Sequence, residues 1–377
     1  MIETPGFLLT ILAFVLVIGP LVFVHEMGHY LAGRWFGVKA DAFSIGFGRE
    51  VAGFTDKRGT RWKVGWLPLG GYVKFSGDMN PASQPSAEWL SMPAEERQRT
   101  FQAKPVWQRA IIVAAGPAIN FAAAILILAG FALAYGEAVM PPVAGAVAPN
   151  SAAAAAGLRA GDRVTALDGR PIDDFADMVR FIQIRAGERV RVELVRDGQS
   201  TSVDAVIATD LQRDRFGNEY RIGRLGLLGP KPEIQPVGLL RAPVVAVERT
   251  GQIVSMMVET LGQVITGRRS VKELGGPLSI AKVSGEQMAL GLDAFVFLIA
   301  LVSINLGFIN LLPVPMLDGG HLLFYAIEAV RRQPLGPEAQ EWAFRGGMLA
   351  ILTLMLFVTF NDLGNLGLWK NLAGLIG

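Results

Sequence analysis

The side chains most able to carry out chemistry are His25, Glu26 and His29, which lie within an apolar stretch beginning near Phe7. On a helix, two histidines four residues apart lie about 40° apart around the axis and one turn apart along it. Both imidazoles can therefore reach one metal ion. Glu26 then lies where it can take a proton from a metal-bound water. This His-Glu-x-x-His pattern is typical of a zinc site that activates water for hydrolysis.

A third ligand for such a site is expected from Asp318, in the motif Asn-Leu-Leu-Pro-Val-Pro-Met-Leu-Asp-Gly-Gly-His at residues 310–321. The prolines break a helix and the paired glycines let the backbone pack closely, so the carboxylate can turn toward a metal. Three protein ligands leave the fourth zinc position for water, as a catalytic site requires. The alternative is that Asp318 caps a turn. His321 is expected beside the site, since as a ligand it would compete with Asp318.

The apolar setting of these residues argues against a chance motif. A charged group near the centre of a membrane span costs about 2.5–3.5 kcal/mol to insert, so ionisable groups there usually mark function. All three histidines of the chain lie next to apolar segments. Asn120, Asn305 and Asn310 are polar groups within such segments. They are expected either to hydrogen-bond between helices or to hold a substrate backbone and its oxyanion near the metal.

The composition predicts that membrane helices position these residues. Of the 377 residues, 51% are hydrophobic and only 18% are charged, whereas a soluble domain has roughly 25% charged residues. The sequence therefore predicts a polytopic membrane protein. A net charge of +2 without a Lys/Arg run argues against nucleic-acid binding. The absence of cysteine excludes disulfides, thiol catalysis and cysteine metal sites.

Four apolar segments are each expected to form a transmembrane helix, because a hydrocarbon core of about 30 Å needs roughly 20 residues. Basic residues concentrate in the short connections at residues 37–104 and 313–345, and such loops stay in the cytoplasm. Both termini and the long middle connection are then expected outside, on the periplasmic side of a bacterial inner membrane. No signal-peptide cleavage pattern precedes the first helix, so it is expected to be retained. The helix boundaries are placed at residues 1–36, 105–136, 290–312 and 346–366.

The connections between these helices are expected to fold in three ways. Residues 37–104 contain Gly-punctuated aromatic strands, expected to form a β-loop that re-enters the membrane, followed by a linker; a surface hairpin is the alternative. Residues 141–230 carry strand patterns, two short helices and an Asp-Gly turn, which predict a partly open β-barrel. Such a domain can take an extended peptide as an added strand. Residues 235–285 are expected to form an amphipathic helix region on the outer membrane surface.

The combination of motifs resembles the bacterial site-2 protease family of intramembrane zinc metalloproteases, in the form that carries an extracytoplasmic PDZ domain. The resemblance implies four transmembrane helices, a membrane-reentrant β-loop and one PDZ domain. A single Gly-Leu-x-x-Gly-Asp signature, at residues 157–162, indicates one such domain rather than two. The matching motifs are His25–His29, Gly46–Gly48, Pro68–Lys74, Gly116–Asn120, Gly157–Val164, Asn305–Pro313 and Leu317–His321.

The resemblance also implies the roles of individual residues. His25, His29 and Asp318 would bind Zn²⁺, and Glu26 would be the general base. The implied activity is the second cut of regulated intramembrane proteolysis. Its substrates would be transmembrane proteins such as anti-sigma factors, with signal-peptide remnants as further candidates, and the PDZ domain would act as a substrate filter. The polar residues implied to bind the substrate are Asn120, Asn305 and Asn310.

Two other classes of function compete with this interpretation. A membrane receptor or chaperone with a purely structural zinc would not need Glu26, and closed zinc sites prefer four protein ligands. An ion or proton transporter could use the same buried groups. A transporter is expected to show inverted repeats and paired half-helices, and the sequence shows neither.

Overall fold

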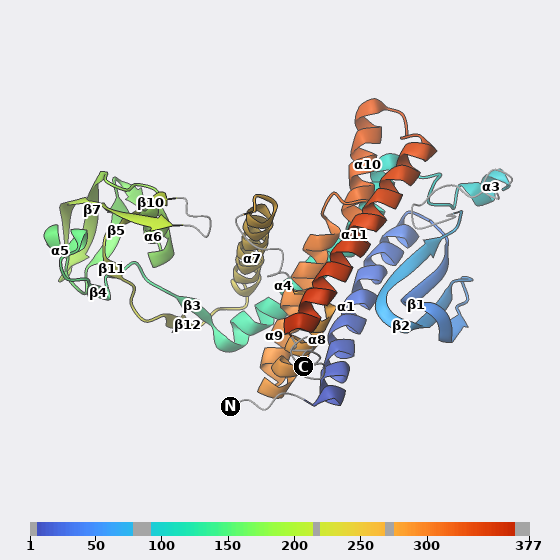
Figure 1. Cartoon of the computed structure of the whole chain (residues 1–377), viewed down its shortest axis with the longest axis horizontal. Helices are drawn as coiled ribbons and strands as arrows, with labels where there is room; N and C mark the ends of the chain where they lie inside the picture. The colour runs from blue at the N-terminus through green and yellow to red at the C-terminus, as the bar shows by residue number, and fades with distance from the viewer. Residues whose placement is uncertain (1–5, 78–91, 214–218, 268–274, 366–377) are drawn as a thin grey trace, which may run out of the picture. The chain divides into compact units, whose positions relative to one another are not determined.

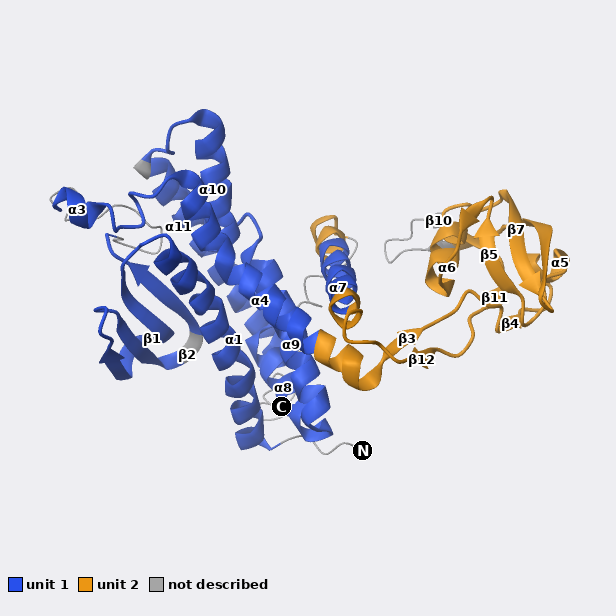
Figure 2. Ribbon diagram, turned by 180° about the vertical axis from the view of Figure 1, so that it is seen from behind, with its two compact units in different colours: residues 1–128, 246–260, 270–377 blue, residues 129–245, 261–269 orange. Residues whose placement is uncertain are grey.

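The structure, a computed structural model, describes residues 6–77, 92–213, 219–267 and 275–365. The chain divides into two compact units, drawn in different colours in Figure 2. Residues 1–128, 246–260 and 270–377 form the first unit, and residues 129–245 and 261–269 form the second. The first unit contains all the residues expected to bind zinc. Part of the predicted linker, residues 78–91, lies outside the described residues.

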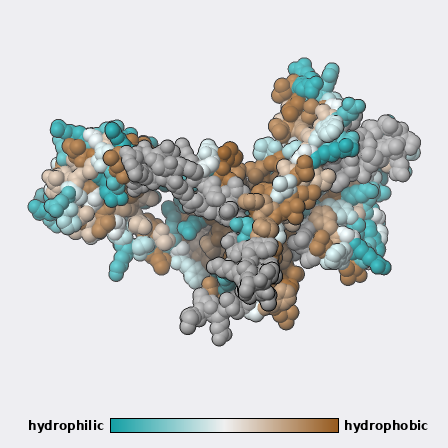
Figure 3. Space-filling view, viewed as in Figure 1, coloured by the Kyte–Doolittle hydropathy of each residue, from teal (hydrophilic) through white to brown (hydrophobic). Residues whose placement is uncertain are grey.

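The first unit is built on helices that are long and apolar enough to cross a membrane (Figure 1). Apolar side chains cover much of their outward surface (Figure 3), for example Leu349, Leu352 and Leu356 on the last of them. Exposed apolar surface on this scale fits a lipid surrounding. The last helix begins before its predicted start at residue 346. The apolar pattern of the sequence did not indicate this earlier start, because the first turns of the helix are polar. Within the described ranges, the four such helices are α1 (Phe7–Trp35), α4 (Val106–Tyr135), α9 (Leu292–Asn310) and α11 (Pro337–Asn365).

A shorter helix, α8 (Pro277–Leu290), packs against α1 and α9. Its Met288 joins an apolar cluster with Ala13 and Val17 of α1. The sequence placed residues 235–285 in an amphipathic helix region on the outer membrane surface, and the last part of that range forms the first turns of α8. Ser284 and Gly285 are small and buried, which permits close contact between helices.

The start of α8 is capped by a carboxylate from a different helix. Asp362 of α11 is buried and accepts hydrogen bonds from the backbone N–H groups of Gly276, at 3.1 Å, and Ser279, at 3.0 Å. The Ser279 hydroxyl donates a third bond, at 2.6 Å. Asp362 therefore satisfies backbone donors that a helix start leaves unpaired, and it ties α11 to α8.

A β-hairpin connects α1 to α4. It consists of β1 (Ala40–Thr55) and β2 (Arg61–Phe75), and α3 (Ala94–Arg97) follows before α4. Bulges bend both strands so strongly that the turn folds back, and the Thr60 hydroxyl donates to the Ala40 carbonyl at 2.9 Å. Phe43 of β1 packs edge-on against Tyr30 of α1. These contacts hold the hairpin along the half of α1 that carries the histidines.

The second unit contains a sheet with the strand order β6-β5-β7-β8. Leu167, Met178, Val192 and Leu194 lie in its buried core, beneath the helices α5 and α6. Asp197 and Gly198 both have positive φ, as a tight turn between β7 and β8 requires. The elements are α5 (Ala152–Ala155), β5 (Arg163–Leu167), β6 (Arg170–Pro171), α6 (Phe175–Gln183), β7 (Arg189–Arg196) and β8 (Gln199–Val206).

Three further strand pairs complete the second unit. The hairpin of β9 (Ala208–Arg213) and β10 (Glu219–Arg224) was not among the expected elements. The pair of β4 and β11 joins the start of the domain to its end, and the pair of β3 and β12 joins the two connecting segments. Their bounds are Glu137–Val139 for β3, Ala146–Val147 for β4, Leu227–Leu228 for β11 and Glu233–Gln235 for β12.

A buried ion pair stabilises this domain. Asp162 is only 1% exposed and accepts two bonds from the Arg196 guanidinium, at 2.8 and 2.7 Å. The Arg159 backbone N–H donates another at 2.7 Å. The Arg196 guanidinium beside Asp162 holds the pKa of that carboxyl below its usual range. The helix α7 (Ala242–Ile265) follows the domain and carries exposed apolar side chains, including Val244, as expected of an amphipathic helix.

Candidate active site

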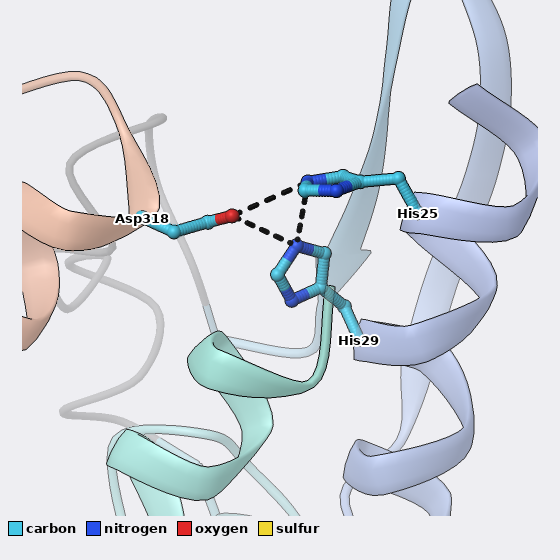
Figure 4. A group of neighbouring side chains, drawn as sticks. All are labelled: His25, His29 and Asp318. Atoms are coloured by element: carbon cyan, nitrogen blue, oxygen red, sulfur yellow. Dashed lines mark hydrogen bonds and ion pairs between the residues drawn. The ribbon is translucent and has the colours of Figure 1, made fainter. Parts of the chain in front are cut away.

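The three expected zinc ligands meet at one point in the first unit. His25 and His29 project from successive turns of α1, and Asp318 begins α10 (Asp318–Arg331) (Figure 4). The Nε2 atoms of the two histidines lie 3.3 Å apart. Oδ2 of Asp318 lies 3.2 Å from Nε2 of His25 and 3.5 Å from Nε2 of His29. Both histidines are buried. Residues that lie about 290 positions apart in the sequence thus form one cluster.

These distances fit a zinc ion. Zinc binds nitrogen and oxygen at about 2.0–2.1 Å, so a tetrahedral site has ligand-to-ligand edges of about 3.3–3.4 Å. The three measured separations are close to that value. Oδ2 of Asp318 is buried and accepts no hydrogen bond from the residues that the structure describes. A buried carboxylate oxygen without a donor is costly unless a cation is bound to it. The donor set of two imidazoles and one carboxylate is also one that catalytic zinc sites use.

The position of His29 is set by α4. Its Nδ1–H donates to the backbone carbonyl of Ile112 at 2.9 Å. A carbonyl can only accept, so Nδ1 carries the proton and Nε2 offers its lone pair to a metal. Gly116 makes room for the ring, since a Cβ there would lie 2.2 Å from Nε2 of His29. Gly28 similarly lets the helices approach, because its Cβ would lie 2.4 Å from the carbonyl oxygen of Ala115.

The other histidine has a side-chain partner. The amide of Asn120, which is 0% exposed, lies 3.0 Å from Nδ1 of His25. A metal on Nε2 requires a proton on Nδ1, and that proton needs an acceptor. In the structure Nδ2 of Asn120 faces the ring, while its buried Oδ1 has no partner among the described residues. Turning the amide by 180° places Oδ1 against Nδ1. Asn120 can then hold the tautomer of His25 that binds zinc.

The turn between α9 and α10 aims Asp318 at the histidines. Met316 has a φ of 87°, a left-handed conformation that side chains other than glycine seldom adopt. A Cβ on Gly319 would lie 2.3 Å from the carbonyl oxygen of Leu311, and one on Gly320 would lie 2.4 Å from that of Val314. The two glycines are therefore required because the turn packs directly on the first turn of α10.

The far end of α10 is fixed to α4 by a partly buried ion pair. Arg109 donates to Glu328 at 2.7 Å, and both side chains are less than 20% exposed. The same guanidinium lies 4.9 Å from the ring centre of Tyr325. Because α4 also contacts both histidines, this pair connects the helix that carries Asp318 to the helix that orients the other two ligands.

Glu26 lies between the metal ligands and β2. The side chain is 8% exposed. A Cβ on Gly71 would lie 3.0 Å from Cγ of Glu26 and 2.6 Å from the carbonyl oxygen of Ser44, so only glycine fits between β1 and this carboxylate. The strand β2 thus passes directly beside the expected general base.

The remaining expected residues have varied surroundings. Asn305 is half-buried and has no hydrogen-bond partner among the described residues, whereas Asn310 donates to the Leu306 carbonyl of its own helix at 3.0 Å. His321 is not part of the metal cluster, and its ring centre lies 5.1 Å from that of Phe344. Sequence reasoning did not find the Ile112 carbonyl or the bond between Arg109 and Glu328. The first has no sequence signal, because every residue has a carbonyl.

The chain is similar to known proteins over most of its length. A family model described as peptidase family M50 matches residues 13–354. The chain is 46% identical over 361 residues to "Putative zinc metalloprotease Atu1380" of Agrobacterium fabrum, covering 94% of this chain and 96% of that protein. It is 36% identical over 394 residues to "Metalloprotease MmpA" of Caulobacter vibrioides, covering 98% and 99%.

Two solved structures match parts of the chain. The solution structure of GtR34C from Geobacillus thermodenitrificans is 33% identical, with a TM-score of 0.17, and the match covers 21% of this chain and 85% of that one. The PDZ domain of the SdrC-like protein of Listeria monocytogenes is 19% identical, with a TM-score of 0.18, covering 25% and 87%.

Proposed function

The chain belongs to peptidase family M50 and is a zinc metalloprotease, and from this premise we propose that it cuts peptide bonds within or near the transmembrane segments of other membrane proteins. The proposal rests on the position of the expected zinc ligands within the molecule. The histidines are buried in a helix that is long and apolar enough to cross a membrane. A substrate must come to that depth to reach them.

The roles proposed for the polar residues follow from their positions. His25, His29 and Asp318 hold the zinc ion, which supplies Lewis-acid activation of water. Glu26 lies next to His25 in the sequence and takes the proton of that water. Its carboxylate can later pass the proton to the leaving amine. Asn120 orients His25, so we assign it to the support of a ligand and not to substrate binding.

The edge of β2 is proposed to hold the substrate. A membrane helix satisfies its own backbone hydrogen bonds, so it must unwind before a peptide bond can be cut. Gly71 lies beside Glu26 and on the strand that ends the hairpin, where an extended segment could add as a further strand. Asn305, whose amide has no partner among the described residues, is suited to bind the unwound backbone, and Asn310 is assigned the same role.

The hairpin is proposed to enter the membrane at its bent end. Exposed apolar side chains there include Phe47, Val51 and Trp66. Water would be a poor solvent for such a cluster, whereas lipid would stabilise it. In the proposed orientation the hairpin side faces the cytoplasm of a bacterial inner membrane, and both termini and the domain at residues 141–230 face the periplasm.

The biological role we propose is the second cut in regulated intramembrane proteolysis. The substrates are transmembrane proteins of the anti-sigma-factor kind, already shortened outside the membrane by another protease. The domain at residues 141–230 is a PDZ domain that excludes substrates still carrying bulky outer domains.

A Glu26→Gln variant tests the proposed chemistry. The side chain keeps its shape and loses its basicity, so cleavage of a model transmembrane substrate should fall by about 10²–10⁴-fold, while the zinc content per chain stays unchanged. Glu286→Gln, the same change on α8, is the matched control and should cleave normally. Undiminished cleavage by zinc-loaded Glu26→Gln would refute the role of Glu26 as the general base.

A further inference from the structure

A second concave site lies at the end of α1 where the hairpin begins. A cavity of about 360 Å³ is lined by Arg34, Lys39, Arg58 and Arg99, and none of the described carboxylates lines it. A neighbouring cavity of about 660 Å³ shares Arg99 with it and adds one more cation and one carboxylate. The four basic residues come from α1, the residue before β1, the hairpin turn and the segment before α4. The fold therefore brings cations from four segments to one hollow.

Most of this positive charge has no ion-pair partner among the residues that the structure describes. Lys39 lies 3.5 Å from Asp41. The guanidinium groups of Arg34, Arg58 and Arg99 form no ion pair with a carboxylate among the described residues. Arg34 acts on Asp56 only through a longer-range electrostatic interaction.

Asp56, a further carboxylate in the hairpin turn, is occupied by hydrogen bonds within the hairpin. Asp56 accepts bonds from the backbone N–H groups of Arg58, at 2.8 Å, and Thr60, at 3.0 Å. The indole of Trp62 donates a third at 3.0 Å. Asp56 thus stabilises its own turn and leaves the three guanidinium groups able to bind an external anion.

Aromatic residues place this hollow at the membrane surface. Trp35 follows Arg34 at the end of α1 and is 87% exposed, and Trp107 at the start of α4 is 58% exposed. Phe36 follows Trp35 in the sequence, and its ring packs edge-on against Trp107, with the ring centres 5.5 Å apart. Exposed tryptophans at the ends of membrane helices lie at the level of the lipid headgroups. The adjoining Arg34 is therefore at headgroup depth.

We propose that this hollow binds the phosphate of an anionic phospholipid. Guanidinium groups match phosphate geometry through paired hydrogen bonds. The exposed tryptophans beside the hollow can pack against the glycerol and upper acyl region of a lipid, which a free anion in solution does not have. A lipid held by Arg34, Arg58 and Arg99 would connect α1 to the hairpin turn and to the segment before α4. It would thereby brace the hairpin beside the active site, independently of which substrate is cut.

Lipid retention by the full-length chain tests this proposal. The chain is purified in mixed micelles with equal amounts of phosphatidylglycerol and phosphatidylcholine, and bound lipid is counted by native mass spectrometry. Affinity is then measured with short-chain phosphatidylglycerol. A basic residue near an anionic surface contributes roughly fivefold in affinity, so the Arg34→Gln/Arg99→Gln variant should bind about 25-fold more weakly. Arg49→Gln/Arg331→Gln removes the same charge from exposed positions outside the hollow and should bind normally.

Three outcomes would overturn the proposal. One is that the variant of the hollow retains phosphatidylglycerol as well as the wild type does. Another is that the control variant loses it equally, which would indicate a diffuse charge effect. The third is that inorganic phosphate binds as tightly as the short-chain lipid, which would assign the hollow to a free anion. Selective retention of phosphatidylglycerol by the wild type and the control alone would support it.

Discussion

The tight contact between α1 and α4 makes a sharp prediction for Gly116→Ala. A Cβ at this position would lie 2.2 Å from Nε2 of His29, the atom expected to bind zinc, whereas ordinary contacts are 3.4–4 Å. The ring must therefore move by at least 3.4 − 2.2 = 1.2 Å. Metal–ligand distances tolerate only about 0.2 Å. The displaced imidazole can no longer complete the site beside His25 and Asp318.

The size of the effect follows from that displacement. A misplacement of about 1 Å at a reacting centre can cost 100-fold in rate, equivalent to about 2.7 kcal/mol. We expect kcat/KM on a transmembrane substrate to fall at least about 100-fold for Gly116→Ala, and zinc affinity to fall by at least about 10–100-fold. Zinc content is measured by elemental analysis, zinc affinity by competition with a chelator, and cleavage by gel assay.

Gly130→Ala is the matched control for this change. It is the same substitution on the same helix, at a position where a Cβ meets nothing within 4 Å. Both substitutions gain about 0.8–1.0 kcal/mol of helix propensity, so the comparison isolates the contact with His29. If Gly116→Ala bound zinc and cleaved substrate to within about twofold of Gly130→Ala, the placement of the His29 ring against Gly116 would be refuted.

Three further predictions concern Asn120, the partner of His25, and the domain at residues 141–230. Asn120→Ala should weaken zinc binding by about 10–100-fold, because Nδ1 of His25 loses its partner; unchanged affinity in chelator competition would contradict the support role. Asp162→Asn should destabilise the domain by about 1.5–3 kcal/mol at pH 7. Arg196 lowers the pKa of Asp162 in the folded state, so the difference in free energy of unfolding between the wild type and Asp162→Asn should be largest above about pH 4, the ordinary pKa of an aspartate, and should shrink as the pH falls below it. Denaturant titrations at several pH values measure this difference, and a difference independent of pH would contradict the role of the ion pair. Deleting residues 143–229 should permit cleavage of substrates that still carry outer domains, and continued dependence on a first cut would contradict the filter role.

Much of the active site could be predicted because its residues are chemically distinctive. The spacing of His25 and His29 places two imidazoles on one helix face, and Asp318 stands in a motif that stops a helix and starts another. The prediction of a zinc metalloprotease is confirmed by the family match. The roles of Asn305 and Asn310 remain predictions.

What could not be predicted depends on the backbone and on packing. The partner of His29 is a carbonyl, which has no residue type, and the need for glycine at position 116 depends on where a ring from another helix lies. The packing of α8 against α1 and α9 was not predicted, because Lys282 and Glu286 interrupt its apolar pattern. Its position is stabilised by Asp362, which lies far away in the sequence. The periodicity of apolar residues along a helix does not indicate which distant residues will contact it.

The separation of the proposed zinc ligands in the chain also has a consequence for biosynthesis. His25 and His29 leave the ribosome early, whereas Asp318 follows only after three of the four long helices and the whole second unit have been made. Every nascent or truncated chain that ends before Asp318 lacks the third expected ligand. We therefore expect such a chain to be unable to hydrolyse peptide bonds, although it exposes unfolded membrane segments of the kind that the finished enzyme is proposed to cut. The timing of metal loading would protect the protein from its own activity while it is being made.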